Sequence, residues 1–158
     1  MSFPTRTLAA GAALLLVFGL GPSATAPPRK GAERGVRLAL IRLNGLLSRR
    51  DMGVVEEFVD ADDTLLIGAA AGEKARGRVA LENHFRELFK RAETLSYSWR
   101  EVQVSVNGTT AWLYAAGEAV LQGEGGEQRT PYSLTGVLEL HGGVWLWRLF
   151  HGSSVGSA

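Results

Sequence analysis

The part of the chain after Thr94 most constrains the fold, because it consists of long segments with strand character joined by short turns. Asn107-Gly108 is a strong signal for a tight hairpin between the first two segments. The Gly-rich stretch 123–128 predicts a looser hairpin, and His141-Gly142-Gly143 predicts a third, tight one. We therefore expect four consecutive strands in an antiparallel meander, at residues 95–106, 109–122, 129–140 and 144–151.

The first of these strands contains a break in its alternation. Tyr97 and Trp99 share one parity, whereas Val102 and Val104 share the other. A β-bulge near Arg100 or Glu101 would return all of these side chains to one face. Because bulges bend sheets, this pattern predicts a curved sheet that wraps around other elements.

Two helices are predicted before the first short strand. The first extends from Gly35 to near Arg50, with apolar residues at helical spacing: Val36, Leu40, Leu43 and Leu47. Asp51 is a plausible N-cap for a second, short helix, so a corner is expected between the two.

A short strand and a further helix are predicted between residues 62 and 90. The apolar run at 62–72 fits one buried strand, flanked by Asp62-Asp63 and by Gly72. The next segment has the clearest helical pattern in the chain, with Leu81, Phe85, Leu88 and Phe89 on one face. These elements, together with the meander, predict one α+β domain over residues 35–154, with the sheet around the N-terminal helices.

The first 26 residues have the organisation of a secretory signal peptide. Arg6 precedes an apolar run from Leu8 to Leu20, and the small-residue triplet Ala24-Thr25-Ala26 follows it. A run of about 13 residues is shorter than the ~20 that a membrane-spanning helix needs. We therefore expect an exported protein, periplasmic or secreted, with a flexible lead-in at residues 27–34 and no permanent membrane span. Pro27 leaves the cleavage site open, because a proline beside the scissile bond hinders cleavage.

Charge and cysteine content exclude several classes of function. The formal net charge is +1, and removal of residues 1–26 with Arg6 would leave a neutral protein, so nucleic-acid binding is not expected. The chain has no cysteine, which excludes a disulfide framework and thiol catalysis. The three histidines show no metal-ligand spacing, and we expect neither a metal nor a cofactor.

Several motifs resemble the nuclear transport factor 2-like fold, in particular its SnoaL-like, ketosteroid-isomerase-like branch. They are the Asp62–Gly68 strand, Gly77 before the long helix, Val106–Trp112 and the ending Trp145–Ser153. The resemblance covers roughly residues 35–154 and implies a cystatin-like α+β roll with a cone-shaped pocket, often dimeric through its sheet. No match is found for the carboxylate base and paired oxyanion donors of the characterised isomerases, so that mechanism is not transferred.

His151 is the first candidate for catalysis. Strict alternation places it on the same face as Trp145, Trp147 and Leu149, at the end of the last strand. There it could act as a general acid or base, oriented by Asp63 if the fold brings the two together. Alternatively, His151 is a structural histidine and Asp63 a turn or capping residue. His84 and His141 are expected on the solvated surface.

Aromatic residues of the meander are candidates for lining the pocket, because large rings with polar tips suit an apolar ligand that carries a few oxygens. Ordinary core or dimer-interface packing is the alternative for each ring. The candidate ligand-binding residues are Tyr97, Trp99, Trp112, Tyr114 and Trp147, together with the charged Glu118 and Arg129 near the middle of the sheet.

The expected function is binding of a small, mainly apolar molecule, with or without isomerase, dehydratase or hydrolase-type chemistry. Whether the protein is an enzyme stays open. The competing hypothesis is a non-catalytic dimerisation or interaction module whose pocket is filled by its own side chains. The ligand site built on His151 requires a ring that faces the hollow, so a ring turned into bulk water would exclude it.

Overall fold

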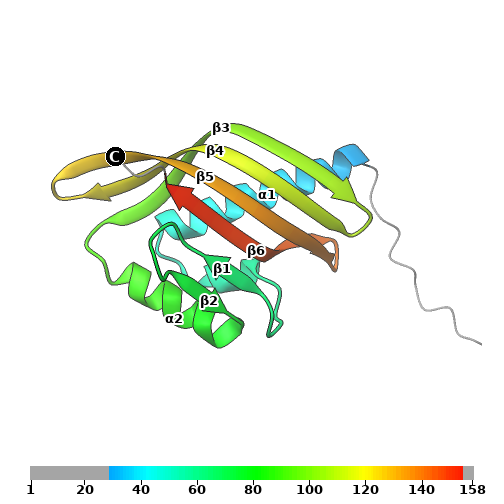
Figure 1. The fold of residues 1–158 in the computed structure, drawn as a ribbon, viewed down its shortest axis with the longest axis horizontal. Helices are drawn as coiled ribbons and strands as arrows, with labels where there is room; N and C mark the ends of the chain where they lie inside the picture. Colours follow the sequence, from blue (N-terminus) through cyan, green and yellow to red (C-terminus); the bar gives the residue numbers. More distant parts are fainter. Residues whose placement is uncertain (1–28, 155–158) are drawn as a thin grey trace, which may run out of the picture.

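The computed structural model describes residues 29–154. A single sheet dominates them, with its six strands in the order β2-β1-β6-β5-β4-β3. Four consecutive long strands form the predicted antiparallel meander (Figure 1): β3 Thr94–Asn107, β4 Thr110–Gly123, β5 Gly126–His141 and β6 Val144–Ser154. Gly108 has a φ of 60°, which a tight hairpin turn requires and glycine adopts without strain. The second hairpin is tighter than expected, since Gly123 and Gly126 pair directly.

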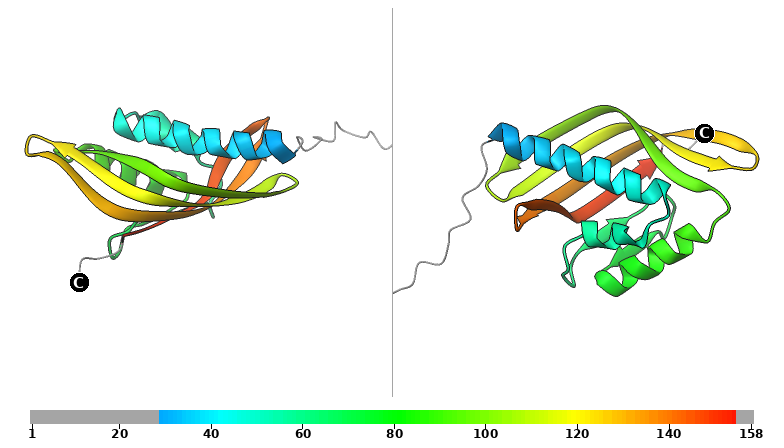
Figure 2. Two further views of the ribbon diagram at one scale, coloured as in Figure 1. Left: turned by 90° about the horizontal axis from the view of Figure 1, so that it is seen from above. Right: turned by 180° about the vertical axis from the view of Figure 1, so that it is seen from behind.

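The bulge predicted in β3 is present. Trp99 pairs with Gly117 and Glu101 with Ala116, so Arg100 is the extra residue. This shift places Tyr97, Trp99, Val102, Val104 and Val106 together against the core. The sheet is curved and unclosed (Figure 2), as the bulge predicts.

A second bulge, which the sequence pattern did not predict, lies in β6. Val137 pairs with Leu149 and Leu138 with Trp147, which leaves Arg148 as the extra residue. The alternation along β6 therefore changes at Arg148. Trp145 and Trp147 are buried before the bulge, and Phe150 and Gly152 are buried after it.

Helix α1, Arg29–Ser48, lies along the concave face of the sheet (Figure 2). It starts before Gly35, because Ala32 is buried and adds a turn to the apolar stripe that Val36 begins. Residues 29–34 are therefore helical, and the predicted flexible lead-in is wrong for them. The signal-peptide prediction at 1–26 lies outside the described residues.

The corner after α1 is held by polar contacts. The Asp51 side chain accepts a hydrogen bond of 2.8 Å from the Gly53 N–H and caps the 3-10 helix η1, Met52–Glu57. Arg42 donates to both carboxylate oxygens of Glu57 at 3.0 Å and to the Trp145 carbonyl at 3.0 Å. One guanidinium thus joins α1, η1 and β6.

The segment predicted as one strand forms two. β1, Leu65–Ile67, runs parallel to β6, and β2, Lys74–Arg76, pairs antiparallel with β1. Helix α2, Arg78–Phe89, packs against β2 and η1, so that Phe58 and Phe85 have ring centroids 5.8 Å apart. Strands β1 and β2 are too short to show hydrophobic periodicity, and the sequence therefore has no signal for β2.

Candidate functional site

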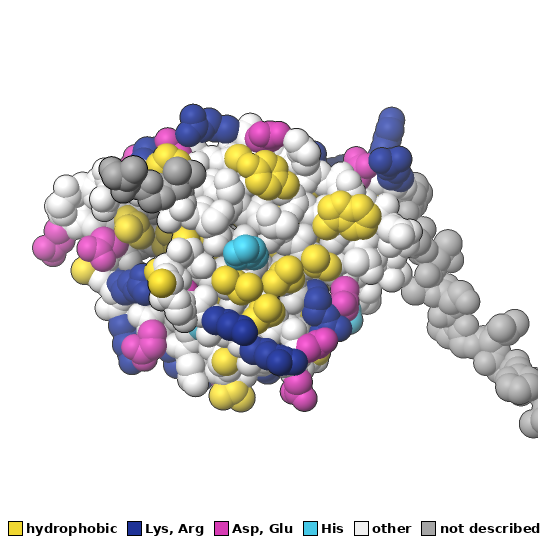
Figure 3. Space-filling view, in the orientation of Figure 1, with side chains coloured by type: hydrophobic (Ala, Val, Ile, Leu, Met, Phe, Trp, Pro, Cys, Tyr) yellow, Lys and Arg dark blue, Asp and Glu magenta, His cyan; other side chains and the backbone are white. Residues whose placement is uncertain are grey.

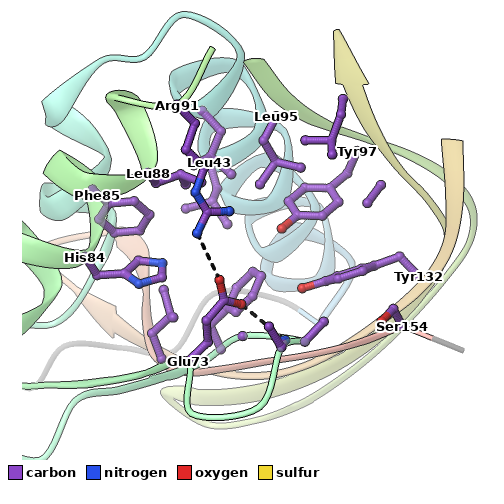
Figure 4. A pocket seen from close by; sticks show the side chains of 18 of the residues that line it. Leu43, Glu73, His84, Phe85, Leu88, Arg91, Leu95, Tyr97, Tyr132 and Ser154 are labelled. Atoms are coloured by element: carbon purple, nitrogen blue, oxygen red, sulfur yellow. Dashed lines mark hydrogen bonds and ion pairs between the residues drawn. The ribbon is translucent and has the colours of Figure 1, made fainter. Parts of the chain in front are cut away.

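A cavity of about 290 Å³ lies between the concave face of the sheet, α1 and α2 (Figure 4). Its walls are largely apolar. Leu43 and Leu47 come from α1, Phe85 and Leu88 from α2, and Phe150 from β6. The cone-shaped arrangement of sheet and helices is therefore hollow within the described residues, not filled by its own side chains.

Two tyrosines place their hydroxyl groups in this cavity. Tyr97 comes from β3 and Tyr132 from β5, and Figure 4 shows both hydroxyls pointing inward. Their ring centroids are 4.9 Å apart, and Tyr97 also stacks on Trp99 at 5.0 Å with an interplanar angle of 19°. Burial raises the pKa of Tyr97 well above its ordinary value, and the interaction and hydrogen bond with Tyr132 raise it further. Burial also raises the pKa of Tyr132, and the hydrogen bond with Tyr97 opposes that increase. Both hydroxyls thus keep their protons near neutral pH, and a ligand oxygen that replaced their mutual hydrogen bond could accept from both.

Two charged side chains next to β2 and α2 face the same cavity. Glu73, just before β2, forms an ion pair of 3.4 Å with Arg91, which follows α2 (Figure 4). The Glu73 carboxylate also accepts a hydrogen bond of 3.3 Å from the Ala70 N–H. Glu73 is therefore held by two partners beside the cavity.

His84 of α2 also lines the cavity, which corrects the expectation that it lies on the solvated surface. Its ring is half-buried and meets Phe85 edge to face, with centroids 5.2 Å apart. Burial lowers the pKa of His84, Arg91 lowers it further, and Glu73 opposes them. A ring held neutral in this way has a free nitrogen lone pair that can accept a proton.

His151 does not face the cavity. The bulge at Arg148 reverses the alternation, so the prediction that His151 shares a face with Trp145 and Trp147 is wrong. The His151 side chain is exposed on the outer face of the sheet, between its neighbours Ile67 and Thr135. The ligand site built on an inward-facing His151 is therefore excluded.

Asp63 also lies away from the cavity. Its carboxylate forms an ion pair of 2.7 Å with Arg148, and its side chain is 64% exposed. Arg148 is at the same time bound to Glu139 at 2.8 Å. The structure gives Asp63 a surface ion pair in place of the predicted contact with His151.

The predicted aromatic lining is divided between three environments. Tyr97 lines the cavity. Trp99 packs behind Tyr97, and Trp147 is fully buried in the core, so neither reaches the cavity wall. Trp112 and Tyr114 lie on the outer face, where they are 50% and 39% exposed.

Glu118 and Arg129 also lie outside the cavity. Glu118 forms ion pairs of 3.2 Å with Arg100 and 3.1 Å with Arg129. These contacts leave both residues in a surface network on β4 and β5. Figure 3 shows the outer face of the sheet, on which hydrophobic side chains gather over the strands.

The predicted site residues do not include Tyr132, His84, Glu73 and Arg91, which line the cavity. Tyr132 is one of the aromatic rings of the meander, several of which were expected to point into the hollow, and it shares its parity with the buried Leu134 and Leu138. His84 lies one turn from both Leu81 and Leu88, at the edge of the apolar stripe of α2. No such pattern identifies Glu73 or Arg91, because both residues lie outside the helices and strands.

Two further properties concern the described residues only. No group of three or more histidine, aspartate or glutamate side chains is arranged to hold a metal ion in residues 29–154. Within the same part of the chain, no helix combines the length and apolar character needed to cross a membrane.

Several solved structures resemble this chain in fold. A nuclear transport factor 2-like (NTF2-like) protein of unknown function from Pseudomonas putida has a TM-score of 0.69 at 18% identity, over 81% of this chain and 89% of that one. A putative scytalone dehydratase from Novosphingobium aromaticivorans has a TM-score of 0.68 at 14% identity, over 78% and 83%. A Catenulispora acidiphila protein in complex with S-DNPA has a TM-score of 0.69 at 12% identity, over 80% and 95%. Identities this low establish the fold alone.

Comparison at the level of sequence identifies the family. No curated protein matches the chain significantly. A family profile described as a SnoaL-like domain matches residues 36–156, which is most of the chain and includes α2 and the whole meander. The fold predicted from the sequence, a curved sheet around helices, is the one observed. The chain therefore belongs to the SnoaL-like domain family, and its fold resembles that of nuclear transport factor 2-like proteins.

Proposed function

We propose that the cavity binds a small, mainly apolar molecule of one or two rings that carries an oxygen atom toward Tyr97 and Tyr132. The observation that carries the proposal is a pair of protonated hydroxyls from two different strands inside one apolar cavity. Two donors that converge on one oxygen can orient a ligand that the apolar walls alone would leave free to turn.

The size of the cavity sets the size of the ligand. Small-molecule pockets usually enclose ~300–1,000 Å³, and about 150 Å³ suffices for a ring such as benzene. A cavity of about 290 Å³ therefore suits one or two rings with small substituents.

Proton transfer is the chemistry that these side chains could supply. The hydroxyls would donate to a carbonyl or developing enolate oxygen, while the neutral His84, close to Glu73, would accept a proton. Isomerisation, dehydration or hydrolysis of a carbonyl-bearing substrate fits this set. The description of one neighbour as a putative scytalone dehydratase supports this class.

Binding of 2-naphthol and naphthalene to the purified protein tests the proposal, because the two probes share an apolar body and differ in one hydroxyl. We expect 2-naphthol to bind more tightly. In Tyr97→Phe and Tyr132→Phe its affinity should fall about 2- to 12-fold, the worth of one hydrogen bond, with naphthalene unaffected. Tyr114→Phe is the matched control, since Tyr114 lies on the outer face. If neither probe binds the wild-type protein, or if Tyr114→Phe has the same effect, the proposal is wrong.

A second proposal concerns the outer face of the sheet, which we infer to be a homodimer interface. Trp112 and Tyr114 are exposed there beside the partly exposed Val137 and Leu149. Nearby charges are paired within the chain, as in Arg148 with Asp63 and Glu139, so no uncompensated charge would repel a second copy. Self-association and ligand binding use opposite faces and are compatible.

Export through a cleaved signal at residues 1–26 remains part of the proposal. It is supported by the sequence of that segment, which precedes the described residues. Amino-terminal sequencing of protein recovered from outside the cytoplasm tests it. A mature terminus near Pro27 is expected, and an intact Met1 in that fraction would contradict cleavage.

A further inference from the structure

The backbone of Tyr97 is held by one side chain of helix α1. The Asn44 amide oxygen accepts a hydrogen bond of 2.7 Å from the Tyr97 N–H, and the amide nitrogen donates one of 3.0 Å to the Tyr97 carbonyl. Both polar groups of one residue are thus bound by a single amide, as a residue of a neighbouring strand would bind them.

This contact lies at the free edge of the sheet. β3 is the last strand in the order and pairs only with β4, in which Ala119 is opposite Tyr97. In an antiparallel pair the N–H and the carbonyl of one residue point to the same side. The N–H and the carbonyl of Tyr97 point away from β4. Asn44 of α1 binds both of them there, and without it they would have to bind water.

The ladder on the other side of Tyr97 is interrupted nearby. Three residues further on, Arg100 is left out of the pairing with β4, so the regular ladder is interrupted between Trp99 and Glu101, and the twist of β3 changes there. The Tyr97 side chain must nevertheless lie against both Trp99 and Tyr132 to point into the cavity.

We propose that Asn44 is a positioning residue for Tyr97, which holds this segment of β3 at the register and tilt that aim the Tyr97 hydroxyl into the cavity beside Tyr132. The purpose of that hydroxyl rests on the proposed ligand function, but the positioning itself does not. Asn44 lies next to Leu43 and three residues before Leu47, both of which line the cavity, so α1 sets the apolar wall and the hydroxyl direction together.

The same helix provides an internal comparison. Arg37 donates a hydrogen bond of 2.9 Å to the Val102 carbonyl, farther along the same edge and beyond the bulge. Val102 packs on the core and does not line the cavity. Arg37 therefore caps the edge without holding a site residue.

The test compares Asn44→Leu, which removes both hydrogen bonds at similar side-chain size, with Arg37→Met. Each protein is measured without ligand, by ¹³Cζ-tyrosine NMR and by the nuclear Overhauser effect between the Tyr97 and Tyr132 rings. Affinities for 2-naphthol and naphthalene are then measured. We expect Asn44→Leu to shift the Tyr97 resonance, weaken the ring contact and reduce 2-naphthol affinity about 2- to 12-fold, with naphthalene binding kept. Arg37→Met should leave all of these unchanged.

A third variant separates the two hydrogen bonds. Asn44→Asp keeps the acceptor for the Tyr97 N–H but sets a carboxylate oxygen against the Tyr97 carbonyl in place of the amide donor, so it too should shift the Tyr97 resonance and reduce 2-naphthol affinity. If Asn44→Leu does not fold, Asn44→Asp is compared with Arg37→Met by the same measurements. Equal spectra and affinities for the Asn44 and Arg37 variants would overturn the proposal. If the wild-type protein binds no 2-naphthol, the ligand function fails, but the NMR comparison still decides the role of Asn44.

Discussion

The hydroxyl of Tyr132 lies against Gly152, in space that the Cβ atom of any larger residue would occupy. Gly152 is buried in β6 and pairs with Leu134, so Tyr132 of the adjacent strand crosses directly over it. The backbone of Gly152 does not have a positive φ, and glycine is therefore needed there for space and not for conformation.

Gly152→Ala should displace the Tyr132 ring from the cavity. Overpacking of this kind costs about 1–3 kcal/mol of unfolding free energy, and 2-naphthol binding should weaken because one donor is lost. Chemical denaturation and probe titration measure the two effects. Gly125→Ala, where an added Cβ meets no atom within 4 Å, is the control. Equal behaviour of the two variants would contradict the assigned position of Tyr132.

His84 should make stability depend on pH. Burial holds the pKa of His84 below its ordinary 6.5, so the unfolded chain takes up a proton at a higher pH than the folded protein. As the pH falls below about 6.5, the free energy of unfolding should decrease until the folded state is protonated too. Urea denaturation at a series of pH values should show a flatter profile for His84→Gln. A His84→Gln profile as steep as that of the wild-type protein would refute the assignment.

The Arg42–Glu57 pair should contribute to stability through its several contacts. Arg42→Met leaves the Glu57 carboxylate, whose side chain is 12% exposed, without its guanidinium partner. We expect the free energy of unfolding to fall by about 1–3 kcal/mol. This is less than for a fully buried pair, because the Arg42 side chain is itself 37% exposed. Arg42→Met/Glu57→Leu should recover part of the loss in denaturation experiments. An exposed pair, Lys90 with Glu87, serves as the comparison and should contribute at most ~1 kcal/mol.

Trp112→Arg should weaken the proposed dimer, because it places a charge in the middle of an apolar face. Sedimentation analysis over a range of concentrations should show at least a tenfold weaker self-association than wild type. Val79→Arg changes an equally apolar residue, 73% exposed on α2, and should have no effect. A monomeric wild-type protein at high concentration would remove the dimer proposal and leave the cavity unaffected.

Local patterns predicted much of the fold. The alternation of Tyr97 and Trp99 against Val102 and Val104 predicted a bulge near Arg100 or Glu101, because side chains on a half-buried strand must return to the core, and the extra residue is Arg100. Asp51 was identified as a cap by residue type alone, since an aspartate before a helical turn accepts from its free N–H groups.

The bulge at Arg148 had no such signal, and the main error about the site follows from it. The residues on both sides of Arg148 are apolar, so the sequence of β6 reads equally well with or without a change of face. Arg148, outside the ladder, forms ion pairs with Glu139 on the adjacent strand and with Asp63, which lies 85 residues away in the sequence. His151 is outside the cavity because of this bulge.

The order of elements, the family and the curved meander can be read from the chain, because hydrophobic periodicity and turn residues act over a few positions. Which polar groups share the cavity depends on contacts between distant segments: Tyr97 is held by Asn44, Tyr132 crosses Gly152, and Glu73 meets Arg91. No local pattern encodes such pairings, because each joins residues of different segments that only the tertiary structure brings together. The single extra residue Arg148 in β6 reverses the alternation of the side chains that follow it, so His151 lies on the outer face and His84 is the histidine that lines the cavity.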